Sequence, residues 1–150
     1  MARYRVLELE RRADPDGEWI PFAVRMKLDL VGLKMGLDDW QALAVADRDE
    51  LLHAPVDTDG DLATFEITLR RLMAAAARPG PKPLSAQKRD AVSAWKEPHA
   101  IAGPAVSMLE RLGRSAVWPE LDRFGRYLVC SLATKDDEER LTAALDELLG

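Results

Sequence analysis

Apolar residues recur three and four positions apart along most of the chain, which is the spacing of one buried helical face. The longest such run covers residues 59–77, where Leu62, Phe65, Leu69 and Leu72 share that face. Acidic residues open the run and arginines lie near its end, as the helix dipole favours. The sequence therefore predicts a long amphipathic helix over 59–77.

The same spacing predicts the remaining helices. They cover residues 21–31, 46–54, 104–113, 116–132 and 136–149, with short helices that Asp38 and Ser85 can cap. Apolar residues also alternate with other residues over 20–30, which is the period of a strand. The similarity of this segment to residues 104–113, as part of an internal repeat, favours a helix. We therefore expect an all-α fold, a single domain over 1–150, with a short extended segment at residues 3–10 and a turn at Asp14–Gly17.

A stretch rich in proline and glycine divides the chain into two similar parts. Residues 78–84 contain three prolines and one glycine, which makes them the clearest internal linker. The helical halves on either side are predicted at about 20–77 and 85–149. A length of 150 residues is enough for one domain of this kind to fold without a disulfide or a metal.

The two halves share a tryptophan motif. A tryptophan, an apolar residue three positions later and an arginine eight positions later occur twice, 78 residues apart: Trp40, Leu43 and Arg48, then Trp118, Leu121 and Arg126. Because the chain has only four tryptophans, this match predicts an internal pseudo-repeat. The alternative is that any two helical units share apolar spacing. Trp40 and Trp118 are interpreted as core anchors, and Arg48 and Arg126 as braces to carbonyls at helix ends rather than ligand clamps.

Composition narrows the class of protein. A net charge of −5 argues against binding to nucleic acid through its phosphates. A single cysteine forms no internal disulfide and suits a reducing compartment, so we expect a cytoplasmic protein. The longest stretch without Asp, Glu, Lys or Arg is residues 98–109, too short to cross a membrane, so no membrane partner is expected.

Familiar catalytic and metal-binding motifs are missing from the sequence. No glycine-rich phosphate loop and no nucleophile elbow occurs. The segment Asp57–Asp61 resembles a calcium loop, but Leu62 and Thr68 stand where that loop needs glycine and glutamate. His53, His99 and Cys130 do not have the spacing of a zinc site. We expect no catalytic residue, no metal and no cofactor, and hence not an enzyme.

One charged strip is a candidate binding site. Arg25 and Asp29 lie four residues apart on one helical face, with Lys27 between them and Lys34 beyond the helix end. These four residues are interpreted either as a solvated face or as a recognition strip for a partner.

The same region carries a family signature. Residues 20–34, IPFAVRMKLDLVGLK, are followed by Trp40, Leu43 and Arg48. Together with the Trp118–Leu132 segment, this pattern resembles the nitrate-reductase-associated protein family and covers roughly residues 20–135. The resemblance implies an accessory protein that contacts assimilatory nitrate reductase during its assembly or maturation, with Arg25, Lys27, Asp29 and Lys34 as its charged strip.

This chain departs from the family pattern at three positions. Trp19, Val31 and Val56 stand where members of the family often have cysteines, which argues against metal or cluster handling through thiols. The competing hypothesis is a helical protein that binds a small molecule or cofactor, for example one that delivers a molybdenum cofactor, and it predicts an apolar pocket. A helical DNA binder is the weakest alternative, because no helix is dense in Arg and Lys.

Overall fold

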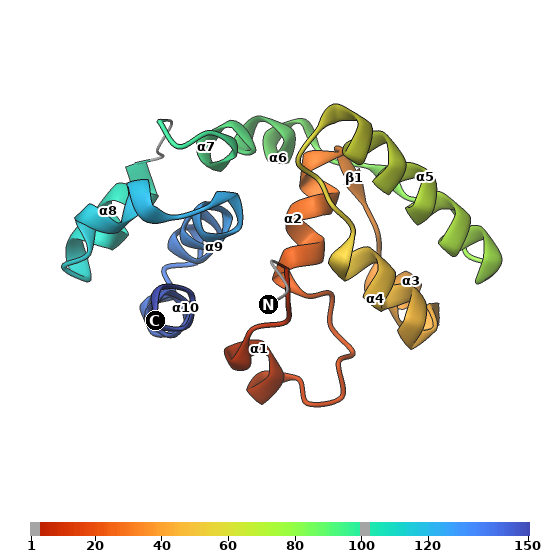
Figure 1. Cartoon of the computed structure of the whole chain (residues 1–150), viewed down its shortest axis with the longest axis horizontal. Coiled ribbons are helices and arrows are strands. Elements are labelled where there is room, and N and C mark those ends of the chain that lie inside the picture. The colour runs from red at the N-terminus through yellow and green to blue at the C-terminus, as the bar shows by residue number, and fades with distance from the viewer. Residues whose placement is uncertain (1–3, 100–102) are drawn as a thin grey trace. The chain divides into compact units, whose positions relative to one another are not determined.

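The computed structural model describes residues 4–99 and 103–150 and confirms the all-α prediction (Figure 1). The chain is 67% helical. Its helices are α1 (Glu8–Ala13), α2 (Phe22–Leu30), α3 (Leu37–Ala42), α4 (Val45–His53), α5 (Asp59–Ala75), α6 (Ala86–Ala91), α7 (Ser93–Lys96), α8 (Gly103–Arg111), α9 (Arg123–Thr134) and α10 (Glu138–Leu149), with a 3-10 helix, η1 (Ser115–Glu120). Two short strands, β1 (Leu33–Lys34) and β2 (Lys82–Pro83), pair with each other. Among the described residues, no helix combines the length and apolar character needed to cross a membrane.

The chain forms two compact units. The first consists of Met1–Val6 and Glu10–Arg89, and the second of Leu7–Leu9 and Asp90–Gly150. Helices α1 and α6 each continue across a division between the units. Each unit has its own apolar interior.

The first unit is built around α2, which is buried on most of its circumference. The buried apolar residues of this helix are Phe22, Ala23, Val24, Met26 and Leu28. Because a helix buried on several sides is apolar at neighbouring positions, its sequence also alternates in the way a strand does. Leu51 and Leu52 of α4 and one face of α5 complete this core.

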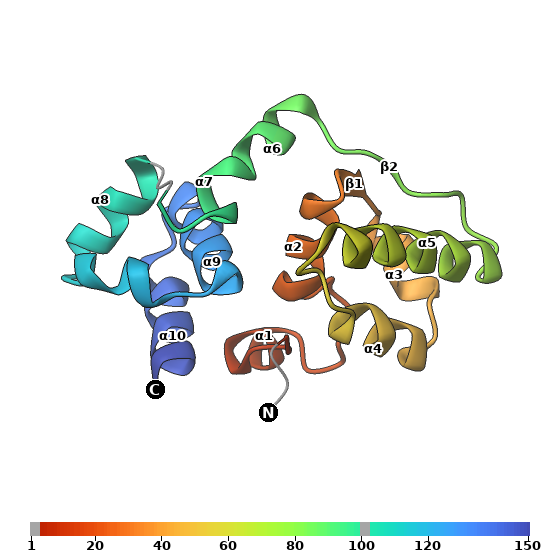
Figure 2. The same ribbon diagram turned by 45° about the horizontal axis from the view of Figure 1, so that its top comes forward.

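The two-residue ladder between β1 and β2 was not predicted. Leu33 pairs with Pro83 and Lys34 with Lys82 in antiparallel register. Gly32 leads from α2 into β1 with a φ of +70°, a conformation that glycine adopts without steric cost, and its carbonyl accepts the Leu84 N–H. Figure 2 shows the chain passing from α5 through β2 to α6. The predicted linker at 78–84 is thus held against the first unit through β2 and the buried Leu84.

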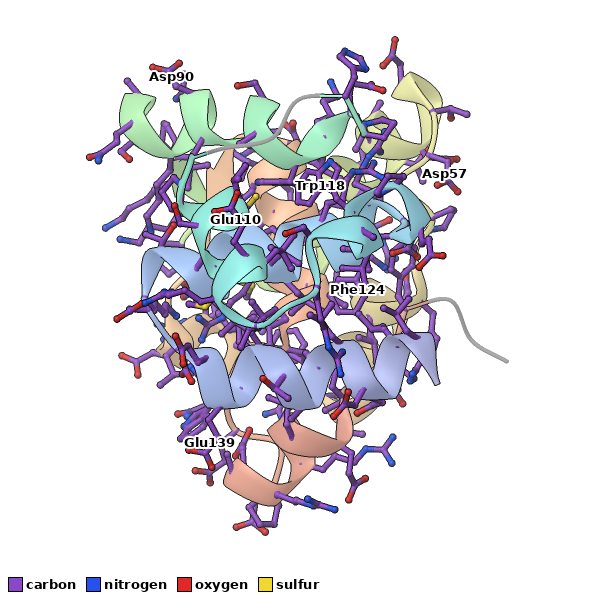
Figure 3. All side chains as sticks on the ribbon, turned by 90° about the vertical axis from the view of Figure 1, so that its left-hand side faces the viewer. Asp57, Asp90, Glu110, Trp118, Phe124 and Glu139 are labelled. Carbon is purple, nitrogen blue, oxygen red and sulfur yellow. The ribbon has the colours of Figure 1, made fainter. Side chains whose placement is uncertain are left out.

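The second unit surrounds α9. This helix contacts α7, α8 and α10, and its buried residues include Phe124, Leu128, Val129 and Leu132. Figure 3 labels Phe124 at the beginning of α9, together with Trp118 in η1. The interior of this unit is therefore made by one central helix and the faces of three neighbours.

Three local predictions were wrong. The run 116–132 is two elements, because Pro119 lies in a 3-10 helix and the Asp122 side chain caps a new helix by accepting the Gly125 N–H. Helix α3 is capped at Gly36, whose N–H donates to the Asp39 carboxylate, rather than at Asp38.

The third wrong prediction is the extended segment at residues 3–10, because the chain is helical from Glu8 onward. Residue 3 lies outside the described residues. By contrast, the turn at Asp14–Gly17 is confirmed by the Gly17 N–H bond to the Asp14 carbonyl.

Candidate functional site

Lys27 lies inside the first unit and has no exposed surface. Its Nζ donates to the carbonyl oxygens of Leu51, Leu52 and Ala54, at 3.2, 2.5 and 2.6 Å. These carbonyls stand at the C-terminal end of α4, where no intrahelical N–H remains to pair with them. An ammonium group has three N–H donors, so the three bonds satisfy it fully.

An aromatic ring completes the surroundings of this ammonium. The Lys27 Nζ lies 4.1 Å from the centre of the Tyr4 ring, within the range of a cation–π interaction. The negative end of the α4 dipole further favours a cation at this position. Lys27 is therefore a cap that joins α2 to the end of α4, and the prediction that it belongs to an exposed strip is wrong.

The other three residues of the predicted strip reach the surface to different degrees. Arg25 is exposed, and its Nε donates to the Ile20 carbonyl at 2.9 Å. Lys34 is exposed on β1. Asp29 is half-buried in the last turn of α2, and its burial raises the pKa of its carboxyl group to about 6, although Lys88 and Arg25 act in the opposite direction.

Four exposed cations lie around the end of α2 and the ladder. We call Lys34, Lys82, Lys88 and Arg89 the basic face. Lys34 and Lys82 are direct partners across the ladder, so their side chains leave the same side of it. The Arg89 Nε lies 4.0 Å from the position that a Cβ on Gly32 would occupy, and Lys88 acts on Asp29 electrostatically. The basic face therefore joins residues that are about 50 positions apart in the sequence.

The sequence contains a pattern that indicates the basic face, and the prediction of a charged strip did not use it. Residues 67–89 contain no Asp or Glu but six Lys and Arg residues. Within a chain of net charge −5, such an acid-free segment marks a local excess of positive charge. The sequence does not predict the two-residue ladder that places this segment beside Lys34.

Arg48 binds backbone oxygens at the end of α3. Its guanidinium donates to the carbonyls of Trp40, Gln41 and Gly17, at 3.1, 3.0 and 3.3 Å. It also lies over the Trp40 ring at 5.7 Å. Trp40 itself is buried, and no hydrogen-bond partner is described for its Nε1. Arg48 thus holds α3, α4 and the loop before α2 together.

Arg126 binds backbone oxygens in the second unit. Its guanidinium is buried and donates to the carbonyls of Trp95, Lys96 and Leu121, at 2.9, 3.2 and 2.8 Å. Burial lowers the pKa of this group, and the nearby Arg123 acts in the same direction. The buried Trp118 donates from Nε1 to the Pro98 carbonyl at 2.7 Å. Because the partners of the two tryptophans and of the two arginines differ in detail, the pseudo-repeat stays a prediction.

Cys130 is half-buried on α9. Burial raises the pKa of its thiol to about 11, although Arg126 opposes this, so the thiolate that reacts with electrophiles or metals is scarce near neutral pH. In the part of the chain that the structure describes, no three His, Cys, Asp or Glu side chains are grouped so that they could hold a metal ion.

Comparison with known proteins places the chain in a family. No curated protein and no solved structure matches the sequence significantly. A family model described as "conserved nitrate reductase-associated protein" matches residues 6–148, which is nearly the whole chain and confirms the resemblance seen in the signature. The chain belongs to the conserved nitrate reductase-associated protein family.

Proposed function

We propose that this chain is a non-catalytic accessory protein that binds nitrate reductase by direct protein–protein contact while that enzyme is assembled or matured. The observation that carries the proposal is the family match over residues 6–148, whose description associates its members with nitrate reductase. The contact mode is supported by three cationic side chains whose hydrogen bonds hold helices in place. Lys27, Arg48 and Arg126 all use their donors on backbone carbonyls.

The charge distribution also supports a contact role. In the first unit the two signs balance, whereas Asp and Glu outnumber Lys and Arg in the second. Figure 3 labels three acidic residues of the second unit, Asp90, Glu110 and Glu139, and all three are exposed. A local basic face on a chain of net charge −5 offers the electrostatic complementarity by which one protein recognises another.

The experiment that tests the proposal compares a strain lacking this chain with the same strain complemented by it. We expect low nitrate reductase activity per molecule of reductase without the chain, and recovery on complementation. The amount of reductase is measured by immunoblot, so that an effect on synthesis is separated from an effect on maturation. Full activity per molecule in the deletion strain overturns the proposal.

A binding measurement separates direct contact from an indirect effect. The full purified chain is passed over immobilised nitrate reductase, in its apo and its active form, from the organism that encodes this chain. We expect saturable binding to at least one form. If neither form binds and the purified chain instead carries a molybdenum cofactor, the cofactor-binding alternative replaces the contact proposal.

A further inference from the structure

We propose that the basic face of Lys34, Lys82, Lys88 and Arg89 is the surface on which this chain docks an acidic patch of nitrate reductase. The inference rests on the proposed function and adds to it the surface used and the chemistry of the partner. The inference is argued from the exposed positions of the four cations and from the charged groups near them.

Lys88 acts electrostatically on Asp29 and Lys82 on Asp39, but within the described residues neither cation forms an ion pair. Among the described residues, Arg70, Arg71, Arg78, Arg111, Arg114 and Arg140 each lie within ion-pair distance of a carboxylate. In that part of the chain, no ion pair involves a residue of the basic face, although all four are exposed. Their charges are thus available to a partner.

The arrangement carries an energetic cost in the free protein. Lys34 and Lys82 stand directly opposite each other on the ladder, and like charges in that position repel. Asp29, on which Lys88 acts electrostatically, is half-buried in the last turn of α2 and forms no ion pair with Lys88 among the described residues. A carboxylate-rich partner removes this repulsion on binding, which favours the bound state.

Lysines on short exposed strands have a second known role, which is to prevent edge-to-edge aggregation of strands. That role requires a charge of either sign and would be kept by glutamate. Docking of an acidic partner requires positive charge and would be reversed by glutamate. Charge reversal therefore separates the two roles, whereas neutralisation does not.

An acidic protein fits this face better than a nucleic acid does. The face offers four cations, while the rest of the chain is acidic enough to give a net charge of −5. A phosphate backbone is a long array of negative charges that needs an extended basic surface, whereas the chain as a whole is acidic. A local acidic patch on a folded partner needs no more than a small cluster of cations such as the basic face.

The test uses two double variants of the full chain, Lys34→Glu with Lys82→Glu on the ladder, and Lys88→Glu with Arg89→Glu on α6. The matched control is Arg70→Glu with Arg71→Glu, which changes the charge equally on the exposed side of α5. The exposed ion pairs that this control removes contribute little to stability. Circular dichroism and thermal unfolding verify that all three variants fold.

Binding to immobilised nitrate reductase is measured at about 0.1 M salt, where exposed charges are screened only beyond about 10 Å. We expect each basic-face variant to bind about tenfold or more weakly, and the control to bind within about twofold of the wild type. If the wild type binds and the basic-face variants bind as tightly, the docking surface is wrong and the proposed function stands. If the wild type does not bind, the proposed function fails and the docking surface falls with it. A mobility shift of DNA or RNA that the wild type produces and the basic-face variants abolish also overturns the inference.

Discussion

At the scale of single residues, the interior position of Lys27 is the least expected feature of the first unit. Its ammonium has exchanged water for three backbone carbonyls and the Tyr4 ring. Those carbonyls in turn depend on Lys27, because they close α4 where no backbone donor follows. Removing the donor alone leaves buried carbonyls without hydrogen bonds. This lowers the stability more than replacing donor and acceptors together by apolar groups of the same shape.

The first prediction concerns this cap. Lys27→Met keeps the length and apolar stem of the side chain but leaves the Leu51, Leu52 and Ala54 carbonyls without their donor. We expect the free energy of unfolding to fall by about 3 kcal/mol. Urea denaturation followed by circular dichroism measures it, with the exposed Lys34→Met as a control that changes stability by less than about 0.5 kcal/mol. Equal stability of Lys27→Met and wild type would show that the buried bonds contribute nothing.

The second prediction concerns Asp29. A carboxyl group whose pKa rises from 3.8 to about 6 on folding binds protons more tightly in the folded state. Its contribution to stability is therefore fully present below pH 3.8 and is lost as the pH rises through about 6. Asp29→Asn removes this loss, so we expect the variant to be more stable than wild type by about 1 kcal/mol at pH 8, a value reduced for partial exposure.

The measurement is the free energy of unfolding between pH 4 and pH 8 for wild type and Asp29→Asn. The difference between the two should grow from pH 4 to about pH 7 and then stay constant. The exposed Asp38→Asn serves as the control, since it removes a carboxylate without this burial. A difference that does not change with pH would show that Asp29 titrates as an ordinary aspartate.

At the scale of elements, helical spacing predicted most of the helices because each buries a face of its own sequence. Residues 59–77 and 136–149 became α5 and α10 with small shifts at their ends. The same spacing failed at 116–132, where Pro119 has no N–H to continue an α-helix, a signal that was present in the sequence.

The candidate site was less predictable, for a physical reason. Helical periodicity reports which side of an element is apolar, but it does not report which distant backbone atoms a polar residue meets. Lys27 reads as a surface residue until α4 places its carbonyls beside it, 24 to 27 positions further along the chain. The ladder that assembles the basic face is two residues long, below the length at which any alternation can be recognised.

The third prediction concerns the turn that connects α2 to β1. Gly32→Ala forces a side chain into a φ of +70°, while its Cβ would meet no atom closer than 4.0 Å. The expected loss of stability, about 1 kcal/mol, therefore comes from backbone strain and not from a clash. Thermal unfolding measures it against Gly103→Ala, a glycine without a positive φ whose Cβ would meet no atom of the described residues within 4 Å. A variant as stable as this control would mean that the turn tolerates a side chain.

At the scale of the whole molecule, the two signs of charge are distributed unevenly. The net charge of −5 falls on the second unit, whereas the basic face belongs to the first. An approaching acidic protein is therefore attracted by one region of this chain and repelled by another. Both effects act at long range and both are screened by salt.

The fourth prediction follows from that screening. If the basic face steers an acidic partner, the association rate constant for nitrate reductase should fall by about tenfold between about 0.05 M and 0.5 M salt for the wild type. Lys88→Glu with Arg89→Glu should associate slowly at low salt and approach the wild-type rate at high salt, because screening removes the same attraction that the substitutions remove. Surface plasmon resonance measures both rates, with Arg70→Glu and Arg71→Glu as the control that keeps the wild-type salt dependence. The opposite outcome is a variant that associates more slowly than wild type by the same factor at every salt concentration. The defect would then lie in the shape of the contact, and the basic face would act through direct packing instead of through its charge.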